Sequence, residues 1–461
     1  MPNVLVVYYF TRPYPPRESI RDHLYSFERY APGRCYYFNA ALGSRPLWTR
    51  VIKFDLVVFH TTLLAVRWNR DRFRRLMSRL AWLGRLPAVK AVLPQDEFIS
   101  TDLLAEFIDR FDVGHVFSPA SDADRPLIYG QVRRPDVSHT HVLTGYLDEG
   151  MLARVDRLAR TSDARSIDIG YRARSARAWL GRRGLLKSRV AEQFVERLAT
   201  SGLALDISLA PEDTLLGDAW YDFLLKSKYT IGAEGGASLH DHDGSTRRRT
   251  EQFLAAHPDA QFDEIEAACF PDRDGNLALQ ALAPRHLEAC ATRTCQVLVA
   301  GAYDGVLEPG KHYIELQPDF ANLDEVVAQL ADDSLRRSIV EQAYQDIVAS
   351  GRYTYRKFVE LVLERSLGEL ELPSPLAGEG PGVRGRRSSD RLLAGRRLLQ
   401  TAAHRAAHWR DRAGWRFVAA VGWALRQCDR RRKPRVSQVA NSGAQGRHVA
   451  IEPCAAEPVA C

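Results

Sequence analysis

The sequence lacks the short signatures of several large enzyme classes. No G-x-G-x-x-G follows its first hydrophobic segment, and the patterns G-x-x-x-x-G-K-[ST], H-E-x-x-H and G-x-S-x-G do not occur. A dinucleotide fingerprint, a P-loop, a zinc-protease helix and a nucleophile elbow are therefore not expected. The sequence also has no run of about eighteen apolar residues, which a membrane-spanning helix requires.

Cysteine is present but without pattern. The seven cysteines are scattered, odd in number and never spaced as Cys-x-x-Cys, so neither a zinc site nor a disulfide framework is predicted. The N-terminal segment MPNVLVVYYF has no basic region and no small-residue cleavage site, and it resembles a buried strand more than a signal peptide. We therefore expect a protein of the reducing cytoplasm.

The net charge of +7 is confined to one end of the chain. From Leu367 onward there are 17 Lys and Arg against 8 Asp and Glu, whereas the rest has 47 against 49. A core without basic excess is not expected to bind nucleic acid. The segment 368–461 begins rich in Pro and Gly and is predicted to be a disordered, low-complexity basic tail. The alternative is a basic helix in weak contact with the surface of the inner membrane.

The first 367 residues alternate between strand-like and helix-like segments. Short, nearly continuous apolar runs separated by amphipathic stretches predict parallel sheets covered on both faces. A polar, Arg-rich stretch, Asp163–Ser175, interrupts this alternation and is predicted to connect two domains. The fold class is therefore α/β, with two tandem Rossmann-like domains at 1–165 and 166–367. The last helix, Tyr353–Leu367, is expected to pack back toward the first domain.

The most informative segment is Ala283–Gly301, APRHLEACATRTCQVLVAG. Pro284 is predicted to open a short helix whose unsatisfied N–H groups favour a diphosphate. Arg285 could add a cation in the first turn, and Glu288, one turn later, could accept two hydrogen bonds from a ribose diol. The alternative is an amphipathic helix with an ordinary surface Arg and Glu.

This segment resembles the donor-site helix of GT-B glycosyltransferases of the group 1 kind, particularly the spore-maturation-protein-like branch. Those enzymes carry a Pro-Arg-x-x-Glu-Ala segment and then a loop and a strand, and 302–319 resembles the family's segment after the donor helix. The resemblance implies a GT-B fold, a nucleotide-sugar donor and ribose binding by Glu288. It also implies a role in surface polysaccharide or glycoconjugate synthesis in a bacterium. Where the group often has a second Glu, eight residues before Glu288, this chain has Gln280.

Further donor-binding residues are expected around the same cleft. Arg172 and Lys187 could meet phosphate charge where the second domain begins, or they could belong to a solvated basic linker. The glycine-containing loops IGAEGG and HDHDG could approach the donor closely. The donor-site residues predicted from these loops are Glu234, Gly235, Gly236, Asp241 and Asp243. Because GT-B enzymes generally work without a metal, no cofactor or divalent ion is expected, although Asp241 and Asp243 have a spacing that could hold one.

Two strand ends of the first domain are candidates for the acceptor side. Ligands bind beyond the carboxyl ends of parallel strands, and His60 and Asp96 follow two such strands. Asp96 is the first candidate for the base that deprotonates an acceptor hydroxyl, and His60 is the second. The sequence thus predicts a glycosyltransferase acting on a glycan or glycoconjugate acceptor. The alternative is an inactive sugar- or nucleotide-binding protein that retains the fold.

Overall fold

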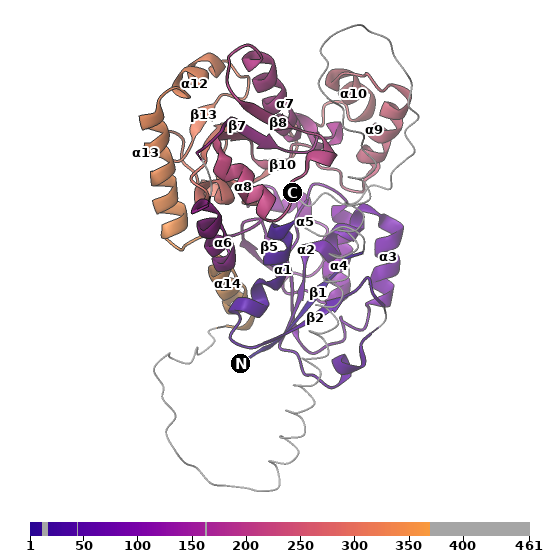
Figure 1. Cartoon of the computed structure of the whole chain (residues 1–461). Helices are drawn as coiled ribbons and strands as arrows, with labels where there is room; N and C mark the ends of the chain where they lie inside the picture. The colour runs from indigo at the N-terminus through magenta and orange to yellow at the C-terminus, as the bar shows by residue number, and fades with distance from the viewer. Residues whose placement is uncertain (12–16, 44, 162–163, 369–461) are drawn as a thin grey trace, which may run out of the picture.

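The computed structural model describes residues 1–11, 17–43, 45–161 and 164–368; the predicted tail, 368–461, lies outside these residues except for Gly368. The first half of the chain forms a parallel six-stranded sheet with the order β2-β1-β3-β4-β5-β6 (Figure 1). Its strands are β1 (Asn3–Tyr8), β2 (Arg34–Asn39), β3 (Leu56–Phe59), β4 (Val89–Val92), β5 (His115–Ser118) and β6 (Ser138–His141).

Alternate side chains of these strands enter two separate cores. In β1, Leu5 and Val7 join the cluster that packs under α3 and α4, whereas Val4 and Val6 join the cluster on the other face. All four are fully buried, which explains why the strand reads as a continuous apolar run.

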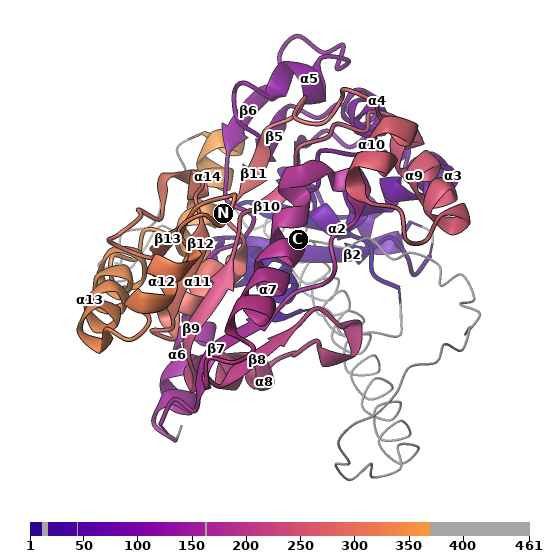
Figure 2. The same ribbon diagram turned by 90° about the horizontal axis from the view of Figure 1, so that it is seen from above.

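The second half forms a parallel five-stranded sheet with the order β13-β12-β9-β7-β8. Its strands are β7 (Ile167–Arg172), β8 (Leu205–Ser208), β9 (Ser227–Gly232), β12 (Cys295–Val299) and β13 (Ile314–Leu316), and a separate antiparallel pair is formed by β10 (Gly235–Ala237) and β11 (Leu279–Ala281). Figure 2 shows α7 (Gly181–Leu198) lying over this sheet, where Val190 and Phe194 pack against Ile169. The predicted fold class, two tandem Rossmann-like domains, is confirmed.

Helices cover both sheets. Those of the first half are α1 (Glu18–Tyr30), α2 (Thr61–Leu64), α3 (Arg70–Arg79), α4 (Thr101–Phe111), α5 (Arg125–Tyr129) and α6 (Glu149–Ala159). Those of the second half are α7, α8 (Asp218–Lys226), α9 (Ser245–Ala256), α10 (Phe262–Cys269), α11 (Pro284–Ala291), α12 (Leu323–Gln329), α13 (Asp333–Ala343), a π-helical turn (Tyr344–Ala349) and α14 (Tyr355–Leu367). Short 3₁₀ segments lie at Leu47–Arg50, Ala65–Trp68, Ala178–Leu180, Pro211–Asp213 and Tyr303–Gly305.

The last helix returns to the first sheet, as predicted. In α14, Phe358 and Val362 belong to the same buried cluster as Val4 and Phe27. The chain passes from the first domain to the second after β6 and returns just before α14. The two connecting segments are hydrogen-bonded to each other. Leu147 N–H donates to the Tyr353 carbonyl at 2.8 Å, and Tyr355 N–H donates to the Leu147 carbonyl at 2.9 Å.

One prediction about the connection between the domains is wrong. The described part of Asp163–Ser175 is not merely a linker, because it contains β7, which pairs with β8 and β9 inside the second sheet. The strand was hidden by charged residues: Asp168 and Arg172 lie within it and Arg174 follows closely, yet Ile169 and Tyr171 are buried. None of the described helices is both long enough and apolar enough to cross a membrane.

Candidate functional site

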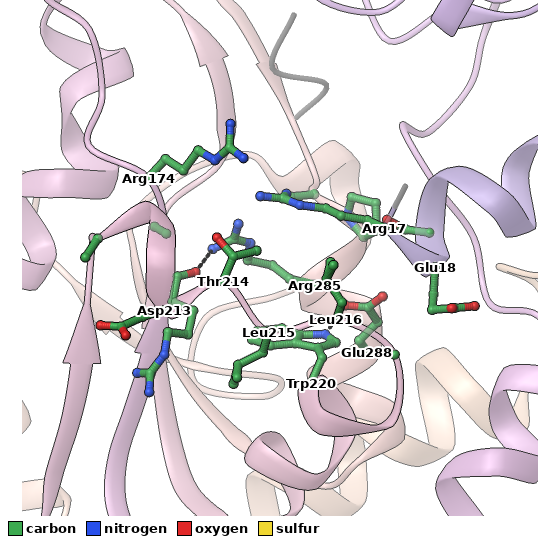
Figure 3. A pocket seen from close by; sticks show the side chains of 17 residues that line it. Arg17, Glu18, Arg174, Asp213, Thr214, Leu215, Leu216, Trp220, Arg285 and Glu288 are labelled. Atoms are coloured by element: carbon green, nitrogen blue, oxygen red, sulfur yellow. Dashed lines mark hydrogen bonds between the residues drawn. The ribbon is translucent and has the colours of Figure 1, made fainter. Parts of the chain in front are cut away.

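A pocket opens between the two halves of the molecule (Figure 3). It lies at the carboxyl end of β7 and beside the first turn of α11, and the beginning of α1 closes it from the first domain. Its lining residues come from four places along the chain: 17–19, 172–174, 210–220 and 283–288. Pockets at this edge of a parallel sheet are the usual ligand sites of such folds.

Glu288 is one of three carboxylates that line this pocket, together with Glu18 and Asp213. It sits in the second turn of α11, and its Oε2 accepts a hydrogen bond from Trp220 Nε1 at 2.7 Å. Burial raises the pKa of Glu288, and the nearby Asp22 charge adds to this, while Trp220, Arg285 and Arg17 oppose it. With Oε2 engaged by the indole, Oε1 is the oxygen that can accept from a ligand.

Arg285 and Arg172 are fixed by different partners. Arg285 Nη1 donates to the Arg172 carbonyl at 2.9 Å, and its guanidinium lies 5.9 Å from the centroid of the Tyr171 ring. Arg172 itself turns to Asp206, with Nη2 2.7 Å from Oδ1, and lies over the Phe223 ring. Arg285 is therefore the cation presented to the pocket, whereas the charge of Arg172 is largely compensated.

Two further arginines complete the cationic side. Arg174 follows the end of β7 and is exposed, and Arg17 directly precedes α1 of the first domain. In Figure 3 the guanidinium groups of Arg17, Arg174 and Arg285 project toward the same space. Three converging guanidinium groups suit a ligand with phosphate charge, which they can bind in bidentate fashion.

The opposite side of the pocket is apolar. It is formed by Leu215, Leu216 and Trp220, which lie before and within α8 (Figure 3). Gly217, at the start of α8, has φ +62°, a left-handed conformation that favours glycine. This turn brings the two leucines beside the indole and creates a surface on which a flat ring could pack.

The apolar wall, the Glu288 carboxylate and the guanidinium cluster follow one another in the same order as the base, ribose and phosphates of a nucleoside diphosphate. An apolar wall could pack against a base, a carboxylate could accept from a diol, and a cluster of guanidinium groups could bind two phosphates. Of the predicted donor residues, the structure brings Arg172, Arg285 and Glu288 to this pocket. Lys187, Glu234, Gly235, Gly236, Asp241 and Asp243 are not among its lining residues.

The glycine-containing loop after β9 makes its contacts with other segments of the second domain. Glu234 accepts hydrogen bonds from the Tyr303 N–H at 2.6 Å and the Ala302 N–H at 3.3 Å, and burial raises its pKa. Gly236 has φ +127°, and a Cβ there would lie 2.0 Å from the Leu279 carbonyl oxygen. The absence of a side chain at Gly236 therefore lets this loop approach β11 closely. Lys187 lies half-buried in α7, where its carbonyl accepts from the Tyr171 hydroxyl at 3.1 Å.

The predicted HDHDG loop forms a contact between the two domains. The Asp241 carboxylate caps α9, accepting from the N–H groups of Thr246 and Arg247 at 3.0 and 2.9 Å. Its backbone N–H donates to the Phe98 carbonyl at 2.7 Å. Asp243 accepts from the Ser245 N–H at 3.0 Å, and hydrogen bonds from the hydroxyl and then from the N–H of Ser245 lower its pKa. The described residues contain no group of three or more His, Cys, Asp or Glu placed to hold a metal ion.

Asp96 and His60 both lie at strand ends of the first sheet and are buried. Asp96 has φ +56°, strained for a residue other than glycine, and its carbonyl accepts from Arg67 Nη2 at 2.6 Å. His60 Nε2 lies 2.9 Å from His23 Nδ1, and His60 Nδ1 accepts from the Thr62 N–H at 3.2 Å. Burial lowers the pKa of His60 well below its usual value, so its imidazole is neutral and caps α2.

No protein-family model matches the chain, and no curated protein matches it in sequence. Solved structures do. The chain is similar to HepE of Anabaena in complex with UDP-glucose, at 11% identity and a TM-score of 0.45 over 79% of this chain and 100% of that one. It is similar to OtsA in its apo form (9%, 0.42, 80% and 100%) and to sucrose-phosphate synthase of Thermosynechococcus elongatus (11%, 0.42, 80% and 99%). All three similarities are distant in sequence.

Three pocket residues were missed in the sequence. Arg174 could have been found, because it stands two residues beyond Arg172 and follows a strand once β7 is recognised. Trp220 carried only the signal of an aromatic residue in a helix. Arg17 belongs to the other domain, and no local pattern relates it to Glu288.

Proposed function

We propose that this protein is a glycosyltransferase that binds a nucleotide-sugar donor in the pocket and transfers its sugar to an acceptor hydroxyl. The observation that carries the proposal is the placement of Glu288 between the apolar wall and the cluster of Arg17, Arg174 and Arg285. We further propose that it belongs to the group 1 enzymes of the GT-B type, in the spore-maturation-protein-like branch.

The pocket explains what the protein would contribute to the reaction. The acceptor oxygen attacks the anomeric carbon, the bond from that carbon to the diphosphate oxygen breaks, and the acceptor proton passes to a base. Negative charge then grows on the departing nucleoside diphosphate, and the three guanidinium groups would stabilise it. Orientation of the donor by Glu288 and the apolar wall would supply the rest of the rate enhancement.

Asp96 is our first candidate for the base and His60 the second. Asp96 follows β4 at the edge of the sheet that faces the second domain, and its strained backbone is held by Arg67. Both nitrogens of the His60 ring have partners at 3.2 Å or less. Asp96→Asn should abolish transfer while leaving nucleotide affinity unchanged if the proton passes to it.

We propose a glycan or glycoconjugate of the bacterial surface as the acceptor, made on the cytoplasmic side or at the inner membrane. The donor is tested first. A thermal-shift series with UDP, GDP, ADP, CMP and TDP should identify one nucleotide that raises the melting temperature, and its sugar derivatives should then be hydrolysed or transferred. If no nucleotide is bound, the proposal fails.

A second candidate is a nucleotide-binding protein without catalytic activity. Gln280, which stands where a second Glu is common in the group, accepts a hydrogen bond from Arg183 Nη1 at 3.1 Å in β11. It does not line the pocket. This candidate predicts nucleotide binding without hydrolysis or transfer of any donor, so a radiolabelled donor assay separates it from the glycosyltransferase.

A further inference from the structure

Helix α11, which carries Arg285 and Glu288, begins without a side-chain cap. The residue at its N-cap position is Ala283, which has no side chain that could accept a hydrogen bond from the first turn. The direction in which the helix starts therefore depends on what holds Leu282, the residue before the cap. Because Arg285 and Glu288 follow within two turns, a change of direction at this point would move both pocket side chains.

Both backbone polar groups of Leu282 are hydrogen-bonded to side chains from distant parts of the chain. Its carbonyl accepts from Thr144 Oγ1 at 2.7 Å, and its N–H donates to Asp304 Oδ2 at 2.7 Å. Leu282 and Thr144 are both buried. Removal of either side-chain partner would therefore leave a buried backbone group unsatisfied, which is costly.

The bond to Thr144 comes from the first domain. Thr144 follows β6, and its own carbonyl accepts from Gln95 Nε2 at 2.8 Å, a buried contact within that domain. The next residue, Gly145, packs directly on the first residue of α11: a Cβ at Gly145 would lie only 2.6 Å from Cγ of Pro284. The segment after β6 thus contacts the beginning of α11 at two successive residues.

Asp304 is itself held by the first domain. His141, the last residue of β6, places Nε2 3.2 Å from Oδ1 of Asp304, while Oδ2 is the oxygen that binds Leu282. Asp304 also has φ +53°, a left-handed conformation that is uncommon for a residue other than glycine. Such a conformation persists where the surrounding structure fixes it, and here the Asp304 carboxylate has a partner in each domain.

We propose that Thr144 and Asp304 are positioning residues for the donor site, which hold the start of α11 so that Arg285 and Glu288 project into the pocket. The inference rests on the proposed binding of a nucleotide there. Neither residue lines the pocket, so each acts through the backbone of Leu282. Binding groups need to be held within about 0.5 Å of their productive positions, whereas helix ends without such support fray.

The first test is isothermal titration of the full chain and its variants with whichever of UDP, GDP, ADP and TDP raises the melting temperature most. Thr144→Val removes the hydroxyl at nearly the same size and should weaken binding about fivefold, the effect of one neutral hydrogen bond. Thr144→Ser keeps a hydroxyl and should restore binding. The matched control is Thr101→Val. The Thr101 hydroxyl also bonds across the domain boundary, 2.8 Å from His240 Nε2, but it belongs to the HDHDG contact, so its loss should leave affinity unchanged.

Hydrogen exchange in the nucleotide-free protein gives a readout that does not depend on the proposed function. The peptide containing Leu282 and α11 should exchange faster in Thr144→Val and in Asp304→Ala than in wild type. Asp304→Asn keeps an oxygen for the Leu282 N–H and should protect this peptide better than Asp304→Ala does.

The outcomes separate this inference from the proposed function. If wild type binds none of the nucleotides, the proposed function fails and the positioning role fails with it. If wild type binds but Thr144→Val binds equally well, the positioning role alone is refuted. It is also refuted if exchange of the α11 peptide is unchanged, or if Thr101→Val loses as much affinity as Thr144→Val, because the effect would then be a general loosening of the domain contact.

Discussion

The hydrogen bond between Glu288 and Trp220 makes a sharp test of ribose binding possible. Because Trp220 Nε1 occupies Oε2, truncation to alanine would both remove a ligand contact and leave a half-buried indole N–H without an acceptor. Glu288→Gln avoids the second effect, since the amide keeps the size of the side chain and one oxygen that can accept from the indole.

Glu288→Gln should weaken nucleotide binding substantially. A hydrogen bond to a charged group contributes about 1.5–3 kcal/mol, which corresponds to a loss of roughly ten- to a hundredfold in affinity. Isothermal titration with the nucleoside diphosphate selected by the thermal-shift series measures this. The 2′,3′-dideoxy form of the same nucleotide should bind wild type and Glu288→Gln equally weakly, because it lacks the diol.

Two results would refute this reasoning. The first is an equal loss of affinity on dideoxy substitution in both proteins, which would mean that the carboxylate does not touch the diol. The second is Trp220→Phe reproducing the Glu288→Gln defect with no further loss in the double variant, which would mean that Glu288 acts only by holding the indole. Acid should also weaken wild-type binding, since burial raises the pKa of Glu288 and affinity is lost as pH falls through it. Glu288→Gln should lack this dependence.

Three more outcomes are expected from the structure. Arg285→Ala should weaken binding of the nucleoside diphosphate much more than that of the free nucleoside, measured by titration of both, because its partner would be phosphate charge. Burial raises the pKa of Asp22 to about 6, so its ionisation in the folded state costs stability that is absent below about pH 4 and grows toward about 3 kcal/mol above pH 6. Asp22→Asn should remove that part of the pH dependence in urea titrations, and an unchanged difference between pH 4 and pH 7 would contradict it. Gly236→Ala should lower the free energy of unfolding by about 2–4 kcal/mol, since its Cβ would collide with the Leu279 carbonyl, whereas Gly275→Ala, with φ +85° and open space around it, should cost only about 1–2 kcal/mol.

The parts of the fold that could be predicted are those determined locally. Pro284 opens a helix as predicted, α11 (Pro284–Ala291), because proline in the first turn and apolar residues at helical spacing are signals within one segment. The buried strand β1 is predictable for the same reason. β7 is not, because charged residues within it and just after it mask its alternation, and the short strands β10 and β11 have too few residues to show a period.

The site was harder to predict because its residues meet only through the tertiary structure. Arg17 and Glu288 are brought together by the packing of α1 against the second domain, which no spacing in the sequence encodes. Asp241 and Asp243 illustrate the opposite error. A pair of carboxylates two residues apart suits a ligand or a metal, but it equally suits the start of a helix, and here both side chains accept hydrogen bonds from backbone N–H groups at the beginning of α9.

The paired connecting segments at Leu147 and Tyr353–Tyr355 have a consequence for how the two halves can move. A single connecting strand would act as a tether and allow one domain to swivel freely against the other. Two segments hydrogen-bonded side by side resist twisting of one domain against the other. Rotation about one axis is then the easiest motion between the domains. The Tyr355 hydroxyl donates to the Ser19 carbonyl at 3.2 Å, so these two segments lie next to the α1 residues that close the pocket. Rotation about this axis would also have to break the contact that the HDHDG loop makes with the first domain, where the Asp241 N–H donates to the Phe98 carbonyl at 2.7 Å, so the two domains are held together at two places.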